Sequence, residues 1–178
     1  RVVGGLCEAI GPVELGADDL GQRDAEVEAR RDERGSHLLQ HRAVGEGHIS
    51  SIAFREGIAH PDGSFDLWPQ SAFATSVELD DASLYDSDDA VTVHRHPESS
   101  LSNTVIFPIT EQQRGGLEDL RLVRFDHGGG EYEWIGTYTA YSGHSIRSEL
   151  LRTVDFRRFL LEPIEGKAGR NKGMALFP

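Results

Sequence analysis

Between residues 115 and 141, two strand-like segments flank a glycine-rich turn, and this pattern constrains the fold more than any other feature of the chain. The first segment contains the apolar run 122–125, and the second, 132–141, is rich in Thr and Tyr. The residues between them, 126–130, end in three consecutive glycines. Strand-forming runs on both sides of a short glycine-containing turn predict an antiparallel hairpin.

Short segments of the same kind recur along the chain and are joined by turns rich in Gly, Asp and Pro. Residues 38–44 and 49–55 flank a turn with two glycines and predict a second hairpin, with Ile52 and Phe54 on one face. No long amphipathic helical pattern interrupts them, so we predict an all-β fold. A meander of four short strands is also the unit of a propeller blade. The further predicted strands are 91–93, 146–153 and an edge strand at 160–164, and residues 105–108 are another apolar segment, which ends at its proline.

The first part of the chain differs from the rest. Residues 1–37 show no clean hydrophobic period, and residues 24–34 form a dense block of alternating charge. Opposite charges at i,i+4 spacing, such as Glu26 with Arg30, favour a helix, whereas the missing apolar face favours a solvated loop. Both alternatives stay open. We therefore divide the chain into a segment 1–37 without assigned structure and a β domain 38–178.

The charge balance limits the classes of partner. Thirty acidic against eighteen basic residues give a formal net charge of -12, which argues against a nucleic-acid-binding or anionic-membrane surface. The single cysteine, Cys7, excludes an internal disulfide and a cysteine-based zinc site, and we expect it to be a small apolar residue. No apolar run approaches the roughly 18 residues of a membrane span, and no signal peptide opens the chain, so we expect a cytoplasmic protein.

Two groups of residues resemble metal ligands without matching a known pattern. The acidic stretch 78–104 lacks the alternating Asp spacing of a calcium loop, and we predict a solvated loop there. His94 and His96 alternate after a short strand, but no third ligand stands at a useful spacing. We predict no metal site.

Glu118, Asp119 and Arg121 lie where the first strand of the central hairpin begins. On a regular strand end, Asp119 and Arg121 point to one face and Glu118 to the other. One carboxylate beside one guanidinium suits a general acid, although the same pattern occurs in surface salt bridges.

A basic cluster, Gly169-Arg170-Asn171-Lys172-Gly173, lies near the end of the chain. Arg170 and Lys172 carry the charges that bind phosphate, and the glycines allow close approach; a solvated basic turn is the alternative.

The aromatic side chains of Trp134, Tyr138 and Tyr141 suit either stacking on a sugar or core packing. The chain has no nucleophile elbow, phosphate-binding loop or dinucleotide fingerprint.

Several of these segments, in order, resemble the conserved blocks of glycoside hydrolase family 130. The resemblance covers roughly residues 38–178. It rests on Glu118-Asp119-x-Arg121, Gly136-Thr137-Tyr138-Thr139-Ala140-Tyr141, Thr153-x-Asp155-Phe156, the run 171–178 (Asn-Lys-Gly-Met-Ala-Leu-Phe-Pro) and the earlier block 42–52.

The resemblance implies a five-bladed β-propeller, of which this chain covers the N-terminal part, and a β-mannoside phosphorylase or β-mannosidase activity. It implies that Asp119 is the general acid, that inorganic phosphate attacks with inversion, and that mannose 1-phosphate is released. No metal or other cofactor is implied. The substrate is then a β-linked manno-oligosaccharide or mannosyl disaccharide, and the chain is compatible with a homo-oligomer. The implied substrate-binding residues are Glu118, Arg121, Tyr138 and Asn171, and the phosphate-binding residues are Arg170 and Lys172.

The chain departs from the family pattern at three points. Leu120 stands where the family usually has proline, which removes a fixed φ angle beside Asp119. Residues 1 to about 35 do not resemble the first blade. The chain starts with Arg and stops where half the propeller would follow, so we expect a fragment. A hydrolase of the same family and a non-catalytic binding propeller remain alternative functions.

Overall fold

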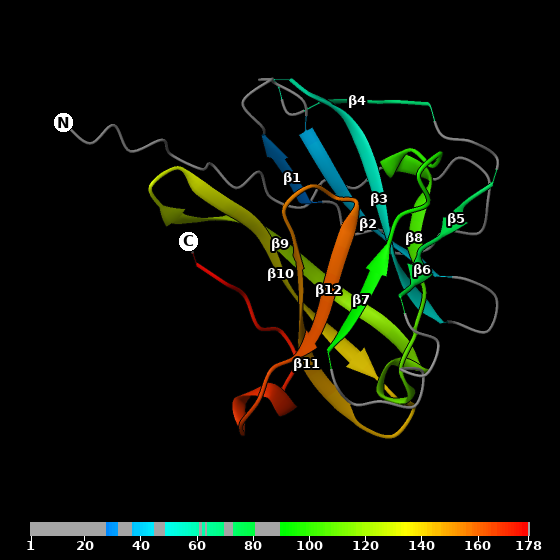
Figure 1. Cartoon of the computed structure of the whole chain (residues 1–178), viewed down its shortest axis with the longest axis vertical. Coiled ribbons are helices and arrows are strands. Elements are labelled where there is room, and N and C mark those ends of the chain that lie inside the picture. The colour runs from blue at the N-terminus through cyan, green and yellow to red at the C-terminus, as the bar shows by residue number, and fades with distance from the viewer. Residues whose placement is uncertain are drawn as a thin grey trace.

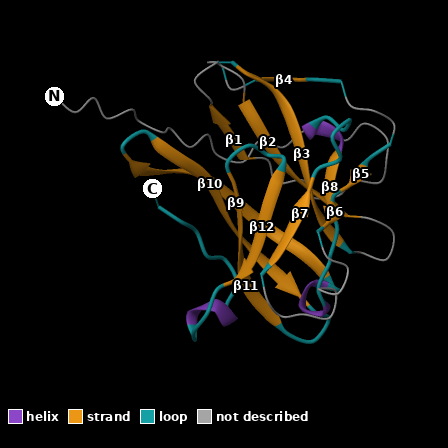
Figure 2. Ribbon diagram, viewed as in Figure 1, coloured by secondary structure: helices purple, strands orange, loops and turns teal. Residues whose placement is uncertain are grey.

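The protein is seen in a computed structural model that describes residues 28–31, 37–44, 49–60, 62, 64–69, 73–80 and 90–177. The described residues form an all-β structure, which confirms the predicted fold class (Figure 2). Three short 3₁₀ turns accompany the strands: η3 (Leu101–Asn103), η4 (Glu111–Gln113) and η5 (Ala168–Arg170). The strands are β1 (Glu28–Arg31), β2 (His37–Val44), β3 (Ser50–Ala59), β4 (Phe65–Leu67), β5 (Thr75–Ser76), β6 (Glu78–Leu79), β7 (Val91–His94), β8 (Thr104–Ile106), β9 (Gly116–Gly128), β10 (Glu131–Tyr141), β11 (Ile146–Thr153) and β12 (Arg158–Pro163).

The strands belong to one sheet that curves into a nearly closed, barrel-like form (Figure 1). Around the sheet, β3 is followed by β9, β10, β11, β12 and β7. One short segment, 75–79, then spans the remaining gap. Its β5 part pairs with β8, which pairs with β3, and its β6 part pairs with β7.

Both predicted hairpins are confirmed. β2 and β3 pair antiparallel from His37 opposite Gly57 to Val44 opposite Ser50. β9 and β10 are longer than predicted, and their turn is confined to Gly129 and Gly130, which both have positive φ. Glycine adopts this conformation without a steric penalty, which explains why the run of glycines stands here.

The antiparallel meander from β9 to β12 is confirmed, but one detail of it is wrong. The last strand, predicted at 160–164 as an edge strand, spans Arg158–Pro163 and pairs with β11 on one side and with β7 on the other. It is therefore an interior strand. The sequence did not indicate this because β7 lies more than 60 positions earlier in the chain.

The prediction of a helix or a solvated loop for the charged block is wrong for residues 28–31. They form β1, which pairs antiparallel with β2 and so gains backbone partners that local charge patterns do not reveal. The remainder of that block, Cys7, the glycine-containing turn 45–48 and the acidic residues 81–89 lie outside the described residues.

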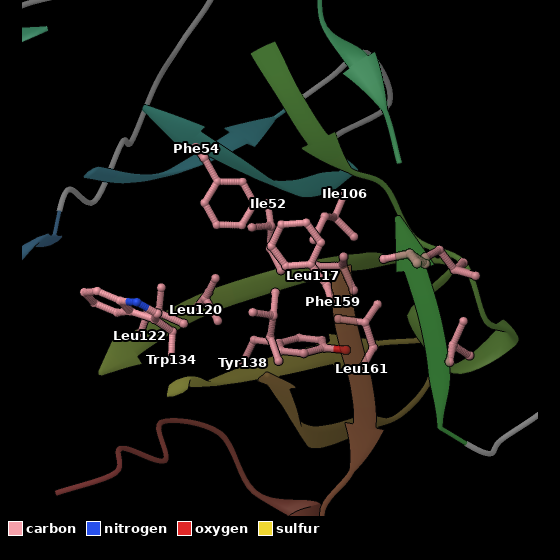
Figure 3. Close-up of a cluster of buried hydrophobic side chains, with 14 of the residues drawn as sticks. Ile52, Phe54, Ile106, Leu117, Leu120, Leu122, Trp134, Tyr138, Phe159 and Leu161 are labelled. Carbon is pink, nitrogen blue, oxygen red and sulfur yellow. The ribbon is translucent and has the colours of Figure 1, made fainter. Parts of the chain in front are cut away.

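The core fills the space that the curved sheet encloses (Figure 3). Phe54 on β3 and Phe159 on β12 are fully buried and stack with ring centroids 5.4 Å apart. Phe156, in the turn before β12, packs against both of these rings and against Trp134. Strands from opposite sides of the sheet thus meet through aromatic side chains.

Replacing Phe159 with alanine should lower the free energy of unfolding by about 3–5 kcal/mol, because it leaves a cavity where three strands meet. Phe177→Ala is the matched control, since Phe177 is 88% exposed, and it should change stability by less than about 0.5 kcal/mol. Urea unfolding followed by tryptophan fluorescence measures both. Equal effects of the two substitutions would contradict this core.

Candidate functional site

The predicted acid, Asp119, lies at a β-bulge inside β9. Thr137 of β10 is opposite Arg121 and Thr139 is opposite Glu118, so Asp119 and Leu120 together face the single residue Tyr138. Asp119 has a φ of 55°, one of two non-glycine residues with positive φ in the described part of the chain. Bulges re-aim side chains, and residues held in this conformation concentrate at functional sites.

The bulge overturns the expected direction of the three polar side chains. Thr137 and Thr139 are two residues apart and share a face of β10, so their partners Arg121 and Glu118 share that face as well. The extra residue turns Leu120 into the core beside Leu122. The prediction that Asp119 and Arg121 point one way and Glu118 the other is therefore wrong, because it assumed uninterrupted alternation.

The face that carries Glu118 and Arg121 points away from the core, and the chain after η5 crosses it. The ammonium group of Lys172 donates to Oε2 of Glu118 at 2.7 Å. Ser148 Oγ donates to the carbonyl oxygen of Asn171 at 2.6 Å, and Thr137 Oγ1 donates to that of Met174 at 2.5 Å. We call residues 171–174 the C-terminal strap.

The structure brings some of the predicted site residues together. Glu118, Lys172 and the backbone of Asn171 meet on this outer face, next to the bulge with Asp119. Arg121 is exposed on the same face. Arg170 is exposed at the end of η5, and among the described residues its side chain forms no ion pair or hydrogen bond with Glu118 or Asp119.

Tyr138 is not brought to this group. It is 2% exposed and points into the core, on the opposite face of the sheet from Glu118. Its hydroxyl donates to Oε2 of Glu149 and accepts from Nε2 of Gln113. Burial, and next the Glu149 carboxylate, raise the pKa of Tyr138 well above its ordinary value.

Tyr138, Glu149, Gln113 and Arg147 form a buried polar group whose members are joined by hydrogen bonds. The Glu149 carboxylate also accepts from Gln113 at 2.7 Å and from two guanidinium nitrogens of Arg147, at 2.6 and 3.0 Å. The Gln113 side-chain oxygen accepts the backbone N–H of Ile109. Full pairing is what makes a buried carboxylate tolerable, and here it fixes β10 opposite the bulge.

Sequence reasoning missed the buried hydroxyl groups of the outer face, two of which, on Thr137 and Ser148, bind the strap. Thr137, Thr139 and Ser148 are each less than 3% exposed although they lie on the outer face. Alternation along the strands predicts that they share a face, because Thr139 is opposite Ser148. Nothing in the local sequence indicates that a segment more than 20 residues later covers them.

Asp155, which belongs to the motif Thr153-x-Asp155-Phe156, lies in the turn before β12. Asp155 Oδ1 accepts the backbone N–H groups of Arg157 and Arg158 at 2.8 and 3.1 Å. Burial alone would raise the pKa of Asp155, but these hydrogen bonds and the two arginine charges outweigh it, so its pKa is lowered. The ionised carboxylate thus stabilises the turn that carries Phe156 into the core.

His94 and His96, for which we predict no metal, have other contacts. His94 pairs with Asp80 at 2.5 Å, and His96 Nδ1 accepts the backbone N–H of Glu98 at 3.2 Å. Within the described ranges, no three His, Cys, Asp or Glu residues are grouped as metal ligands. No helix among the described residues has the length and apolar character needed to cross a membrane.

Comparisons with family models, with curated proteins and with solved structures find no match to this chain.

Substitutions of Asp119 test whether its positive φ strains the backbone, because they change the free energy of unfolding in opposite directions. Asp119→Gly should leave the free energy of unfolding unchanged or raise it by up to about 1 kcal/mol, because glycine adopts positive φ freely. Asp119→Val should lower it by about 2 kcal/mol, since a β-branched residue tolerates this conformation worst. Thermal unfolding measures both. Glu131→Val is the control, because Glu131 is exposed and lacks positive φ, and equal losses at 119 and 131 would contradict the bulge.

Proposed function

We propose that this protein cleaves β-mannosidic bonds by inverting phosphorolysis, with Asp119 as the general acid. The observation that carries the proposal is the position of Asp119 at a bulge with positive φ, directly beside the Glu118–Lys172 ion pair. The ordered motifs that resemble glycoside hydrolase family 130 support the choice of reaction. A strained acidic residue next to paired charges is more typical of a site than of a scaffold.

The chemistry needs one acid and one bound anion. Asp119 supplies a proton to the glycosidic oxygen, in the resembled family by way of a sugar hydroxyl. The bond from the anomeric carbon to that oxygen breaks, and a phosphate oxygen bonds to the anomeric carbon from the opposite side. Mannose 1-phosphate and the shortened sugar leave. Phosphate is already an anionic nucleophile, so no second carboxylate is required as a base, unlike in inverting hydrolysis.

The proposal gives the other residues the roles that the resemblance implies, with one exception. Lys172 and Arg170 attract phosphate, and Glu118, Arg121 and Asn171 bind the sugar hydroxyls beside the acid. Because Tyr138 is buried opposite the bulge, its role is to position Asp119 through the backbone of β10 rather than to touch the sugar.

The five-bladed propeller belongs to the same proposal. The meander β9–β10–β11–β12 has the strand order of one blade. Separate blades require β12 to part from β7 and β9 to part from β3. The second of these junctions rests on one residue pair, Ser50 with Gly116.

Hydrolysis of the same bonds is the second candidate, and one observation favours it. Lys172 already donates to Glu118, so part of the positive charge intended for phosphate is neutralised. A site with less positive charge would bind phosphate weakly and leave water as the nucleophile.

Asp119→Asn should lower turnover of β-linked manno-oligosaccharides by about a hundred-fold or more while substrate binding is nearly kept, because an amide is far too weak an acid to protonate the glycosidic oxygen. Asp126→Asn, an exposed carboxylate on the same hairpin, is the matched control and should keep full activity. The assay measures mannose 1-phosphate and free mannose, with and without inorganic phosphate.

The products decide between the candidates. Mannose 1-phosphate formed only with phosphate supports the phosphorylase. Free mannose regardless of phosphate indicates the hydrolase. Equal turnover by Asp119→Asn and the parent protein would show that Asp119 is not the acid, and binding without any turnover would indicate a carbohydrate-binding protein.

A further inference from the structure

Two arginine residues lie side by side at one end of the barrel-like sheet, away from the site on β9. β7 ends at His94 and β12 begins at Arg158, and these two residues are register partners. The next pair outward is Arg95 and Arg157, joined by the hydrogen bond from the Arg95 N–H to the Arg157 carbonyl oxygen at 2.7 Å. Figure 1 shows β7 and β12 next to each other at this end.

The alternation of β7 directs Arg95 toward the interior. Val91 and Val93 are core residues, and Arg95 continues the same face beyond the last ladder pair. Phe159, opposite Val93, and Phe156 lie in the aromatic part of the core. Arg95 is half-buried as a result, and Arg157 is exposed beside it.

The two guanidinium groups lack a carboxylate at contact distance. Among the described residues, no ion pair or side-chain hydrogen bond joins Arg95 or Arg157 to an acidic group. Asp155 is close, but its Oδ1 accepts backbone N–H groups. Glu56 is also near, and its carboxylate accepts from Ser102 Oγ at 3.4 Å. The negative charges of Glu56 and Asp155 oppose, without reversing, the lowering of the pKa of Arg95 by burial and by Arg157.

The positive charges of Arg95 and Arg157 repel each other. Burial lowers the pKa of Arg95, and the neighbouring positive charge of Arg157 lowers it further. A half-buried guanidinium next to a second one is costly unless an anion compensates it. This pair stands out in a chain whose formal net charge is -12.

We infer that Arg95 and Arg157 form a binding site for a phosphate group, supplied either as inorganic phosphate or as a phosphate monoester. Guanidinium forks match the oxygen geometry of phosphate and donate two hydrogen bonds each. The site is separate from the residues of the proposed phosphorolysis, because it lies just beyond the end of β7 and the start of β12 rather than on β9 and the C-terminal strap.

Isothermal titration calorimetry with inorganic phosphate and with phenyl phosphate, at constant ionic strength, tests the site. We expect saturable binding that weakens about ten-fold or more in Arg95→Gln and in Arg157→Gln, because each loses a charge-assisted bond. Arg158→Gln is the matched control and should keep the affinity, since Arg158 lies one position along the same strand and faces away from Arg95. Tighter binding of phenyl phosphate identifies a monoester, and tighter binding of inorganic phosphate identifies the free ion.

Lys172→Gln separates this inference from the proposed function. Binding that survives Lys172→Gln and is lost in Arg157→Gln supports the arginine site even if the enzyme assay fails. Binding lost only in Lys172→Gln, binding weakened equally by Arg158→Gln, or no saturable binding would each overturn it. Amide chemical shifts of residues 95 and 157 in the unmodified protein give a readout that does not depend on how the variants fold, and unmoved shifts at saturating phosphate would overturn it as well.

Discussion

The burial of three leucines on one strand is the constraint on which this structure depends. Leu117 and Leu122 both lie in the core although they are an odd number of residues apart, and Leu120 lies there with them. A regular strand cannot place all three on one face. The single extra residue at Asp119 brings the alternation of the strand back so that all three leucines face the core. The burial of these leucines and the unusual backbone of the proposed acid therefore have the same origin.

The bulge separates two sets of polar contacts, one on each face of the central sheet. On the inner side, Tyr138 and Glu149 belong to a buried, fully paired polar group that holds β10 in register. On the outer side, buried hydroxyls bind the backbone of the C-terminal strap, which brings Lys172 to Glu118. Charges that are distant in the sequence therefore meet across strands whose relative position is fixed from within.

The sequence was sufficient to predict the parts of the fold that depend on near neighbours. The turn between β9 and β10 follows from local glycines, and the strands follow from period and composition. The bulge was not predictable in the same way, because Leu120 signals a changed face only once Leu117 and Leu122 are known to be buried together. The strand at 28–31, the interior position of β12 and the contact of Lys172 with Glu118 all depend on partners many residues away. Of the proposed site residues, Glu118, Asp119, Asn171 and Lys172 gather as one group, whereas Tyr138 lies behind it.

The backbone pairing between β3 and β9 is much shorter than the pairing within the meander. Only Ser50 and Gly116 pair there, and a Cβ atom at Gly116 would come within 3.0 Å of the Ser50 nitrogen. In the hairpin β9–β10, β10 pairs with β11 from Trp134 to Tyr141, whereas β9 shares one register pair with β3. Partial opening of the native state therefore has a preferred seam in its backbone pairing: side-chain packing, such as the stack of Phe54 on Phe159, rather than ladder hydrogen bonds keeps β3 against the meander, and amide hydrogens at Ser50 and Gly116 would exchange with solvent before those of the meander.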